Sequence, residues 1–188
     1  MAIQGPAVAS LCVAVFAVSG PVLQDWERGY QRIRRVLPAS VASMPKPIRD
    51  DLTRRGCTIP QTYASRGTHN IIRGHFLTRV QTDIAVLCSI GDSSTILVYP
   101  GGGLRDVKEV ATGDDRGYLQ TTGGPEEVGY SRAIGVAAEV DLQRAPEAPD
   151  EQTPPSITHD GIDDAYIEKG SNVWYWTDGR WVRLRGSD

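Results

Sequence analysis

The feature that most constrains the fold is a series of strand-forming segments near the middle of the chain. Segments 70–79, 82–90 and 93–99 are rich in β-branched and apolar residues, which favour strands. Gly91 and Asp92 join the last two segments with a tight hairpin signal. The segment before this turn is apolar on both alternating faces, so we expect it to be a central strand covered on each side.

Two helices are expected to pack on these strands. Segment 47–55 begins at Pro47, carries acids early and arginines late, and is followed by Gly56, the usual order of helix start and stop signals. A second helix is predicted at 104–111, because its apolar residues recur at helical spacing.

Short strands at 116–121 and 128–137 complete the predicted fold class. We expect an α+β domain with a mostly antiparallel sheet of five to seven strands, two or three packed helices and one disulfide. The composition fits a single globular domain, with 40% hydrophobic and 23% charged residues among 188.

The C-terminal segment predicts a β-hairpin around Asp178 and Gly179, a type I′ turn signal. A two-residue loop pairs Trp176 with Trp181, and strand alternation then sorts the side chains onto two faces. One face holds Val173, Tyr175, Val182 and Leu184. The other face, which we call the tryptophan face, holds Trp174, Trp176, Trp181 and Arg183.

The tryptophan face has two interpretations. Aromatic clusters beside arginine form binding surfaces, and flat rings suit sugar stacking. The same indoles are also suited to packing under the leader helix or another layer. If the face is exposed, the expected partner is an envelope protein, a peptide or a saccharide.

The N-terminus predicts export. Residues 1–23 carry no charged side chain, and 7–18 are mostly apolar, which resembles the core of a secretory signal and is too short for a comfortable membrane span. We therefore expect a signal peptide at 1–19 and a periplasmic or extracellular protein with no stable membrane span after cleavage. The alternatives are an uncleaved anchor and a buried N-terminal helix.

The rest of the chain divides into three parts. Residues 20–46 are expected to be a leader or linker with an amphipathic helix, since Trp26 and Tyr30 recur at helical spacing between arginines. Residues 47–188 are expected to form a single domain. Within it, 144–156 is a loop rich in proline and acids.

Removal of the signal leaves Cys57 and Cys88. An even pair in an exported domain indicates one disulfide, and closing a loop between residues 31 apart (88 − 57) stabilises the fold by roughly 3–4 kcal/mol in the chain-entropy model. The alternative is two free buried thiols.

The densest polar cluster is His159, Asp160, Asp163 and Asp164. Three carboxylates and an imidazole suit a divalent cation or acid–base chemistry. The spacing fails the EF-hand and zinc patterns, and an Asp-Gly turn leading into a strand explains the same residues. No cofactor is predicted, and a formal net charge of −3 with no long basic run argues against nucleic acid.

The strand-forming segments take part in two resemblances to known protein families. Gly74, Phe76, Asp83, Ala85 and Val86 resemble one FG-GAP/VCBS repeat unit. The calcium loop of that unit is absent and the unit occurs once, so neither its β-propeller fold nor its calcium site carries over.

The wider succession GCTIPQ, QTDIAVLCS and HDGIDDA is similar to uncharacterised exported bacterial proteins. That resemblance implies a shared fold and an envelope location, and no activity. The sequence thus favours a non-catalytic binding or envelope-associated module. The alternative is a metal-dependent or hydrolytic enzyme centred on the His159 cluster.

Overall fold

The structure is a computed structural model that describes residues 21–123, 127–144 and 156–186. The predicted signal segment at 1–19 lies outside these residues, as does most of the proline- and acid-rich segment at 144–156. No helix of the described part is long and apolar enough to cross a membrane.

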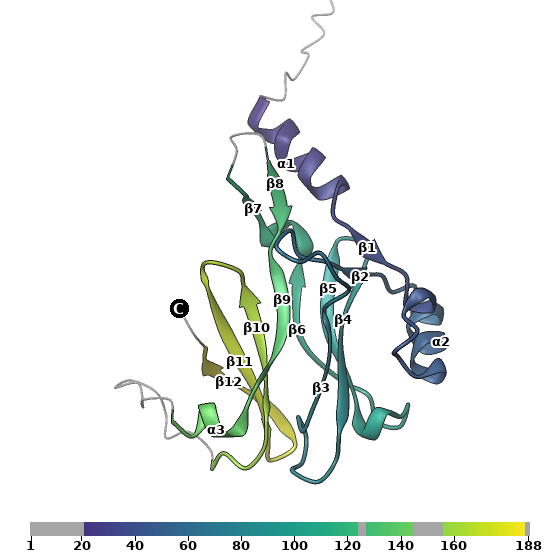
Figure 1. The fold of residues 1–188 in the computed structure, drawn as a ribbon, viewed down its shortest axis with the longest axis vertical. Helices are drawn as coiled ribbons and strands as arrows, with labels where there is room; N and C mark the ends of the chain where they lie inside the picture. Colours follow the sequence, from purple (N-terminus) through teal and green to yellow (C-terminus); the bar gives the residue numbers. More distant parts are fainter. Residues whose placement is uncertain (1–20, 124–126, 145–155, 187–188) are drawn as a thin grey trace, which may run out of the picture.

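The fold is mostly β, so the predicted α+β class with five to seven strands is wrong (Figure 1). The described residues form twelve strands in four antiparallel sheets, with three small helices. The first sheet has the order β3 (Ile71–Gly74), β4 (Asp83–Ile90), β5 (Ser93–Tyr99) and β6 (Lys108–Asp114). The second sheet has the order β12 (Arg180–Arg185), β11 (Gly170–Thr177), β10 (Gly161–Tyr166) and β9 (Arg132–Ala137).

The remaining elements are short. Two ribbons pair β1 (Arg35–Val36) with β2 (Ile59–Pro60), and β7 (Leu119–Thr121) with β8 (Val128–Tyr130). The α-helices are α1 (Pro21–Gln31), α2 (Lys46–Arg55) and α3 (Glu139–Leu142). The 3-10 helices are η1 (Pro38–Ser40), η2 (Pro100–Gly102) and η3 (Asp115–Tyr118).

The two large sheets share one core. Ala85 and Leu87 of β4 project to the same side as Ile96 of β5, and they form one buried cluster with Ile134 of β9 and Ile162 of β10. We call the side of the second sheet that carries Ile134 and Ile162 its inner face. The prediction of a central strand covered on both faces is confirmed for β4, which lies between β3 and β5.

Helix α2 covers the opposite face of the first sheet. Ile48 and Leu52 pack against Ile84, Val86 and other β4 and β5 side chains in a second buried cluster. The helix ends at Gly56, whose φ of 78° is the left-handed conformation that glycine adopts without strain. The predicted helix at 47–55 is confirmed.

The predicted disulfide is also confirmed. Cys57, just after α2, is bonded to Cys88 on β4, with 5.2 Å between the two Cα atoms. The bond therefore ties the helix layer to a central strand of the first sheet.

Asn70 joins the first sheet to the second where β3 packs beside β9. Its side-chain amide donates to the carbonyl of Arg132 at 3.2 Å and to that of Pro60 at 2.7 Å, and its Oδ1 accepts the backbone N–H of Ile134 at 2.9 Å. This single buried side chain replaces strand-to-strand hydrogen bonds between the sheets, and its φ of 65° is one that asparagine tolerates better than most residues.

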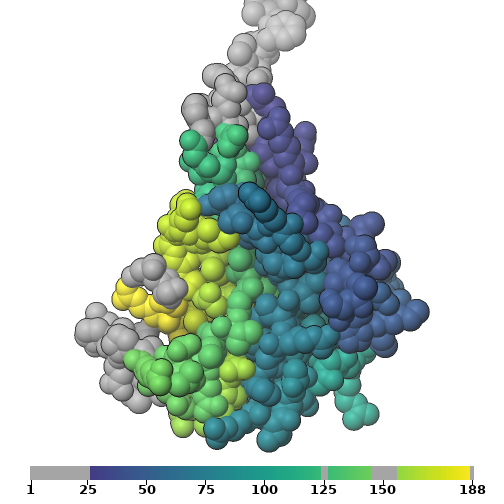
Figure 2. All heavy atoms as spheres, viewed as in Figure 1, coloured from purple at the N-terminus to yellow at the C-terminus, as the bar shows by residue number. Residues whose placement is uncertain are grey.

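Helix α1 and the β7–β8 ribbon project together from one end of the molecule (Figures 1 and 2). Gly29 lies so close to Val128 of β8 that a Cβ on it would fall 2.6 Å from the valine side chain. Trp26 and Tyr30 pack against the shared core. Helix α1 therefore lies against the domain through these two side chains.

The predicted helix at 104–111 is wrong. Residues 108–114 form β6, in which Val110 pairs with Ile96 and Lys108 with Val98 of β5. Hydrogen bonds to the open edge of β5 outweigh the local helical spacing, and Leu104, which completes that spacing, is 45% exposed.

The other strand boundaries also shift. The first strand of the meander is limited to 71–74, the strand predicted at 116–121 begins only after η3, and the one predicted at 128–137 is divided at Ser131 into β8 and β9. Short strands and a break of one residue leave no periodic signal long enough to be recognised.

Candidate functional site

The C-terminal hairpin has the predicted register. Trp176 pairs with Trp181, and Trp174 with Arg183. Cross-strand partners share a face of the sheet, and Trp174 is the partner of Ile162 on β10. The tryptophan face is therefore part of the inner face of the second sheet.

The indoles of this face are half-buried. Trp174 and Trp181 pack against the shared core, and Trp176 meets Trp181 edge-on with 5.1 Å between ring centroids. The Nζ atom of Lys108 lies 5.2 Å from the Trp176 ring centroid, in range for a cation–π contact. Arg183 is exposed beside them.

Strand β12 forms the outer edge of this face. It ends the strand order of its sheet, so within the described ranges no strand pairs with its second edge. The backbone N–H of Gly186 donates to the carbonyl of Ser171. Antiparallel pairs alternate between bonded and non-bonded, so the backbone groups of Val182 and Leu184 point to β11 and those of Trp181 and Arg183 point away.

The structure separates the predicted polar cluster. The imidazole of His159 stacks on Tyr175 at 4.4 Å, and its Nδ1 and Nε2 atoms lie 2.9 and 3.0 Å from the carbonyl oxygens of Asp160 and Trp176. The Asp160 carboxylate accepts the backbone N–H groups of His75 and Glu139. Both side chains hold loops together.

Asp163 and Asp164 are neighbours on β10, so they point to opposite faces. Asp164 lies on the inner face and is bonded to Arg132, while Asp163 lies on the outer face opposite Gly135. Among the described residues, no group of three or more His, Cys, Asp and Glu side chains has the arrangement to hold a metal ion.

The most unusual polar group of the shared core is Arg132, whose side chain is 0% exposed. Its five N–H donors have five acceptors. Two are the Asp164 carboxylate oxygens, at 2.8 and 2.9 Å; two are the carbonyl and hydroxyl oxygens of Ser94; and the fifth is the Ala111 carbonyl. Burial lowers the pKa of Arg132, but the Asp164 carboxylate outweighs burial and raises it overall, so the guanidinium stays charged.

A chain of buried hydrogen bonds continues from Arg132 through the core. The hydroxyl of Ser94 lies 3.3 Å from that of Tyr130, which donates to the buried Asp115 carboxylate at 3.2 Å. Arg35 reaches the same carboxylate at 3.4 Å. Burial raises the pKa of Tyr130, so its hydroxyl stays a donor and the chain links β1, η3 and both large sheets.

Asp164 also lines a surface cavity of about 340 Å³, which we call the tyrosine cavity. Its side chains come from η3, β10, β11 and the turn between these two strands: Tyr118, Asp164, Tyr166, Lys169, Ser171 and Asn172. The cavity therefore opens beside the inner face of the second sheet, next to the tryptophan face.

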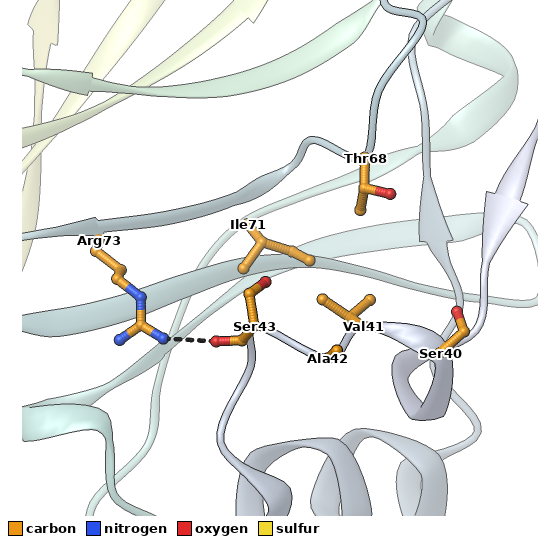
Figure 3. Close-up of a pocket in the computed structure, with 7 residues that line it drawn as sticks. All are labelled: Ser40, Val41, Ala42, Ser43, Thr68, Ile71 and Arg73. Carbon is orange, nitrogen blue, oxygen red and sulfur yellow. Dashed lines mark hydrogen bonds between the residues drawn. The ribbon is translucent and has the colours of Figure 1, made fainter.

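A second hollow, of about 530 Å³, lies between the segment before α2 and β3 (Figure 3). Val41 and Ile71 face each other across it. The Arg73 guanidinium at its edge donates to the Ser43 carbonyl at 2.9 Å, and the Ser40 hydroxyl donates to the Leu37 carbonyl at 2.8 Å. Its polar groups are thus partly used by the protein itself.

Asp83, which the repeat resemblance places in its motif, has a structural role. Its Oδ2 accepts the backbone N–H groups of Phe76 and Leu77, and its Oδ1 accepts the side-chain amide N–H of Gln81 and the backbone N–H of Gly101. Four donors fix the loops at this end of the first sheet.

Comparisons with protein-family models, curated sequences and solved structures found no match to this chain. The similarity to uncharacterised exported bacterial proteins therefore stays a prediction.

Sequence reasoning missed Arg132, Tyr118 and Asn172 as site residues. The available signal was a charge at the start of the apolar strand pattern of 132–137, but nothing in the spacing connects it to Asp164, 32 residues away (164 − 132).

Proposed function

We propose that this chain is an exported, non-catalytic binding module that accepts an extended acidic segment of another envelope protein along β12. The segment would add a strand to the second sheet, with main-chain hydrogen bonds supplying affinity and alternate side-chain contacts supplying specificity. Export is supported by the Cys57–Cys88 disulfide, which persists in oxidising compartments.

The observation that carries the proposal is the outward edge of β12. The backbone groups of Trp181 and Arg183 point away from β11, as the register requires. Figure 1 places β12 on the outer flank of the molecule, on the side opposite α2.

Charge specifies the partner. The six residues of β12 include three arginines and no acid, and Arg180, Arg183 and Arg185 are all exposed. Lysine or arginine on an edge strand also discourages association between like copies, so the same residues that reject a second copy of this strand favour an acidic one.

The proposal is tested by fluorescence anisotropy on the purified protein. The probe is a fluorescein-labelled ten-residue peptide of alternating glutamate and threonine, and its control replaces every glutamate with lysine. We expect the acidic peptide alone to bind, with an affinity that falls as salt rises.

Two variants separate charge from strand pairing. Arg183→Gln removes one exposed charge, worth about 0.2–1 kcal/mol, and should raise Kd by roughly 1.4- to 5-fold. Arg183→Pro also removes an outward N–H and should weaken binding further. Arg105→Gln, at another exposed arginine, is the matched control. Equal binding of both peptides, or no loss with Arg183→Pro, would contradict the proposal.

A further inference from the structure

We infer that the tyrosine cavity is a binding site for a small saccharide, separate from the β12 edge. Its volume of about 340 Å³ is at the lower end of the roughly 300–1,000 Å³ typical of ligand pockets. Its residues come from η3 and from the β10–β11 hairpin, whereas the strand-accepting edge belongs to β12.

The floor of the cavity is a fixed carboxylate with acceptor capacity left over. Asp164 Oδ1 accepts one N–H from Arg132, and Oδ2 accepts a second from Arg132 and one from the Trp174 indole at 3.3 Å. A carboxylate has about four acceptor positions, so a position remains for a ligand hydroxyl. The Asp164 side chain is 7% exposed and lines the cavity.

Asn172 supplies the complementary group. It is the cross-strand partner of Asp164, so the two side chains are neighbours on one face. The Asn172 side chain is exposed, and its amide makes no hydrogen bond to another described residue. Adjacent hydroxyls of a sugar can donate to the carboxylate and accept from the amide, which suits this pair.

Two tyrosine rings line the wall, and each has a cation over one face: the Arg132 guanidinium lies 4.7 Å from the Tyr118 ring centroid, and Lys169 Nζ lies 4.2 Å from that of Tyr166. Tyr118 and Tyr166 meet edge-on at 5.9 Å, and the Tyr166 hydroxyl is fixed by donating to the Leu119 carbonyl at 2.8 Å. Rings that are already held in place suit the C–H face of a sugar because binding then costs little side-chain conformational entropy. Lys169 Nζ lies 3.0 Å from the Tyr166 hydroxyl and adds a donor.

The charges of the cavity favour neutral or acidic sugars over cationic ligands. The Arg132 guanidinium and the Asp164 carboxylate offset each other in their ion pair, and Lys169 adds a positive charge. A sugar acid therefore gains from Lys169, while a neutral sugar relies on Asp164 and Asn172.

The test is a nitrogen-15 NMR titration of the protein with glucose, N-acetylglucosamine and glucuronate. We expect at least one sugar to shift the Asn172 side-chain amide resonances in a saturable way. Asn172→Ala lacks that signal, so its titration is followed through the backbone amide resonances of the cavity residues. The substitution should raise the Kd of the sugar by about 2- to 13-fold, the range that corresponds to the loss of one ordinary hydrogen bond. If glucuronate is the tightest ligand, Lys169→Gln should weaken glucuronate and leave glucose unchanged.

The matched control is Asp163→Asn, on the same strand and the opposite face, which should leave Kd unchanged. Asp164 is unsuitable for the test because its replacement leaves the buried Arg132 charge unpaired. The inference is overturned if no sugar shifts the Asn172 resonances, or if Asn172→Ala and Asp163→Asn affect binding equally. Neither result depends on whether β12 accepts a peptide.

Discussion

At the residue scale, Arg132 and Asp164 determine how the two sheets hold together. The guanidinium crosses from β9 to Ser94 on β5 and Ala111 on β6, while its partner carboxylate lies on β10. A buried ion pair is weak evidence for net stability, but removing one partner leaves an unpaired buried charge, which is strongly unfavourable.

Asp164→Asn is therefore expected to lower the free energy of unfolding by about 3–5 kcal/mol, measured by urea denaturation. Asp163→Asn makes the same chemical change one residue away, on the outer face, and should stay within about 0.5 kcal/mol of the parent protein. Equal effects of the two substitutions on the free energy of unfolding would contradict the role given to the Arg132–Asp164 ion pair.

His69 predicts a pH dependence of stability. Its Nε2 atom accepts the backbone N–H of Thr62 at 2.6 Å, which requires the neutral ring, and burial lowers the pKa of His69 below its ordinary value of 6.5. As pH falls, His69 therefore binds a proton in the unfolded chain before it does so in the folded protein. The contribution of neutral His69 to stability is complete above pH 6.5 and is lost as pH drops through the folded-state pKa.

The expected observation is a difference between parent and His69→Gln. The free energy of unfolding of the parent should fall more steeply than that of the variant as pH drops from about 7.5 to 5. Parallel pH profiles of the parent and the variant would exclude His69 as the source.

At the scale of elements, the join between β3 and β9 depends on one side chain. Asn70→Ala removes three hydrogen bonds. It also places alanine, which has no polar side chain, at a φ of 65°. We expect a loss of about 2–4 kcal/mol and faster hydrogen exchange at the Ile134 amide. Asn70→Gly should cost less, because glycine adopts this φ freely. An unchanged Ile134 exchange rate would contradict the role given to Asn70.

The elements that the sequence predicted share one property, which is a strong local signal. The helix ended by Gly56, the hairpin at Asp178-Gly179 and the turn at Gly91-Asp92 all depend on residues close in sequence. Strand β6 was mistaken for a helix because its pairing with β5 is not visible in its own spacing.

The same limit explains what was missed in the candidate sites. The hairpin register placed the tryptophan face correctly, whereas the tyrosine cavity combines η3 with β10 and β11, and its floor depends on a partner on β9. Such groups come together only through the pairing of sheets, and a single sequence does not encode that pairing as a local pattern.

At the scale of the whole molecule, one disulfide and one buried hydrogen-bond chain connect all the layers. Cys57 and Cys88 tie α2 to β4, while the chain from Arg35 through Asp115 and Tyr130 reaches Arg132. Stability should therefore be lost cooperatively when either connection is removed.

Replacing both Cys57 and Cys88 with alanine is expected to lower the free energy of unfolding by roughly 3–4 kcal/mol. Thiol titration of the full chain under denaturing conditions gives a direct check. Of its three cysteines, one should react before reduction and three after it. Three reactive thiols before reduction would contradict the bond.

The most direct test of strand addition at β12 is hydrogen exchange along this strand with and without the acidic ten-residue peptide. The strand supplies its own control, because the amides of Val182 and Leu184 already point to β11 while those of Trp181 and Arg183 point outward. We expect saturating peptide to slow exchange at Trp181 and Arg183 and to leave exchange at Val182 and Leu184 unchanged. Peptide that fails to bind, or that binds without protecting Trp181 and Arg183, would contradict the claim that this protein works by accepting a strand.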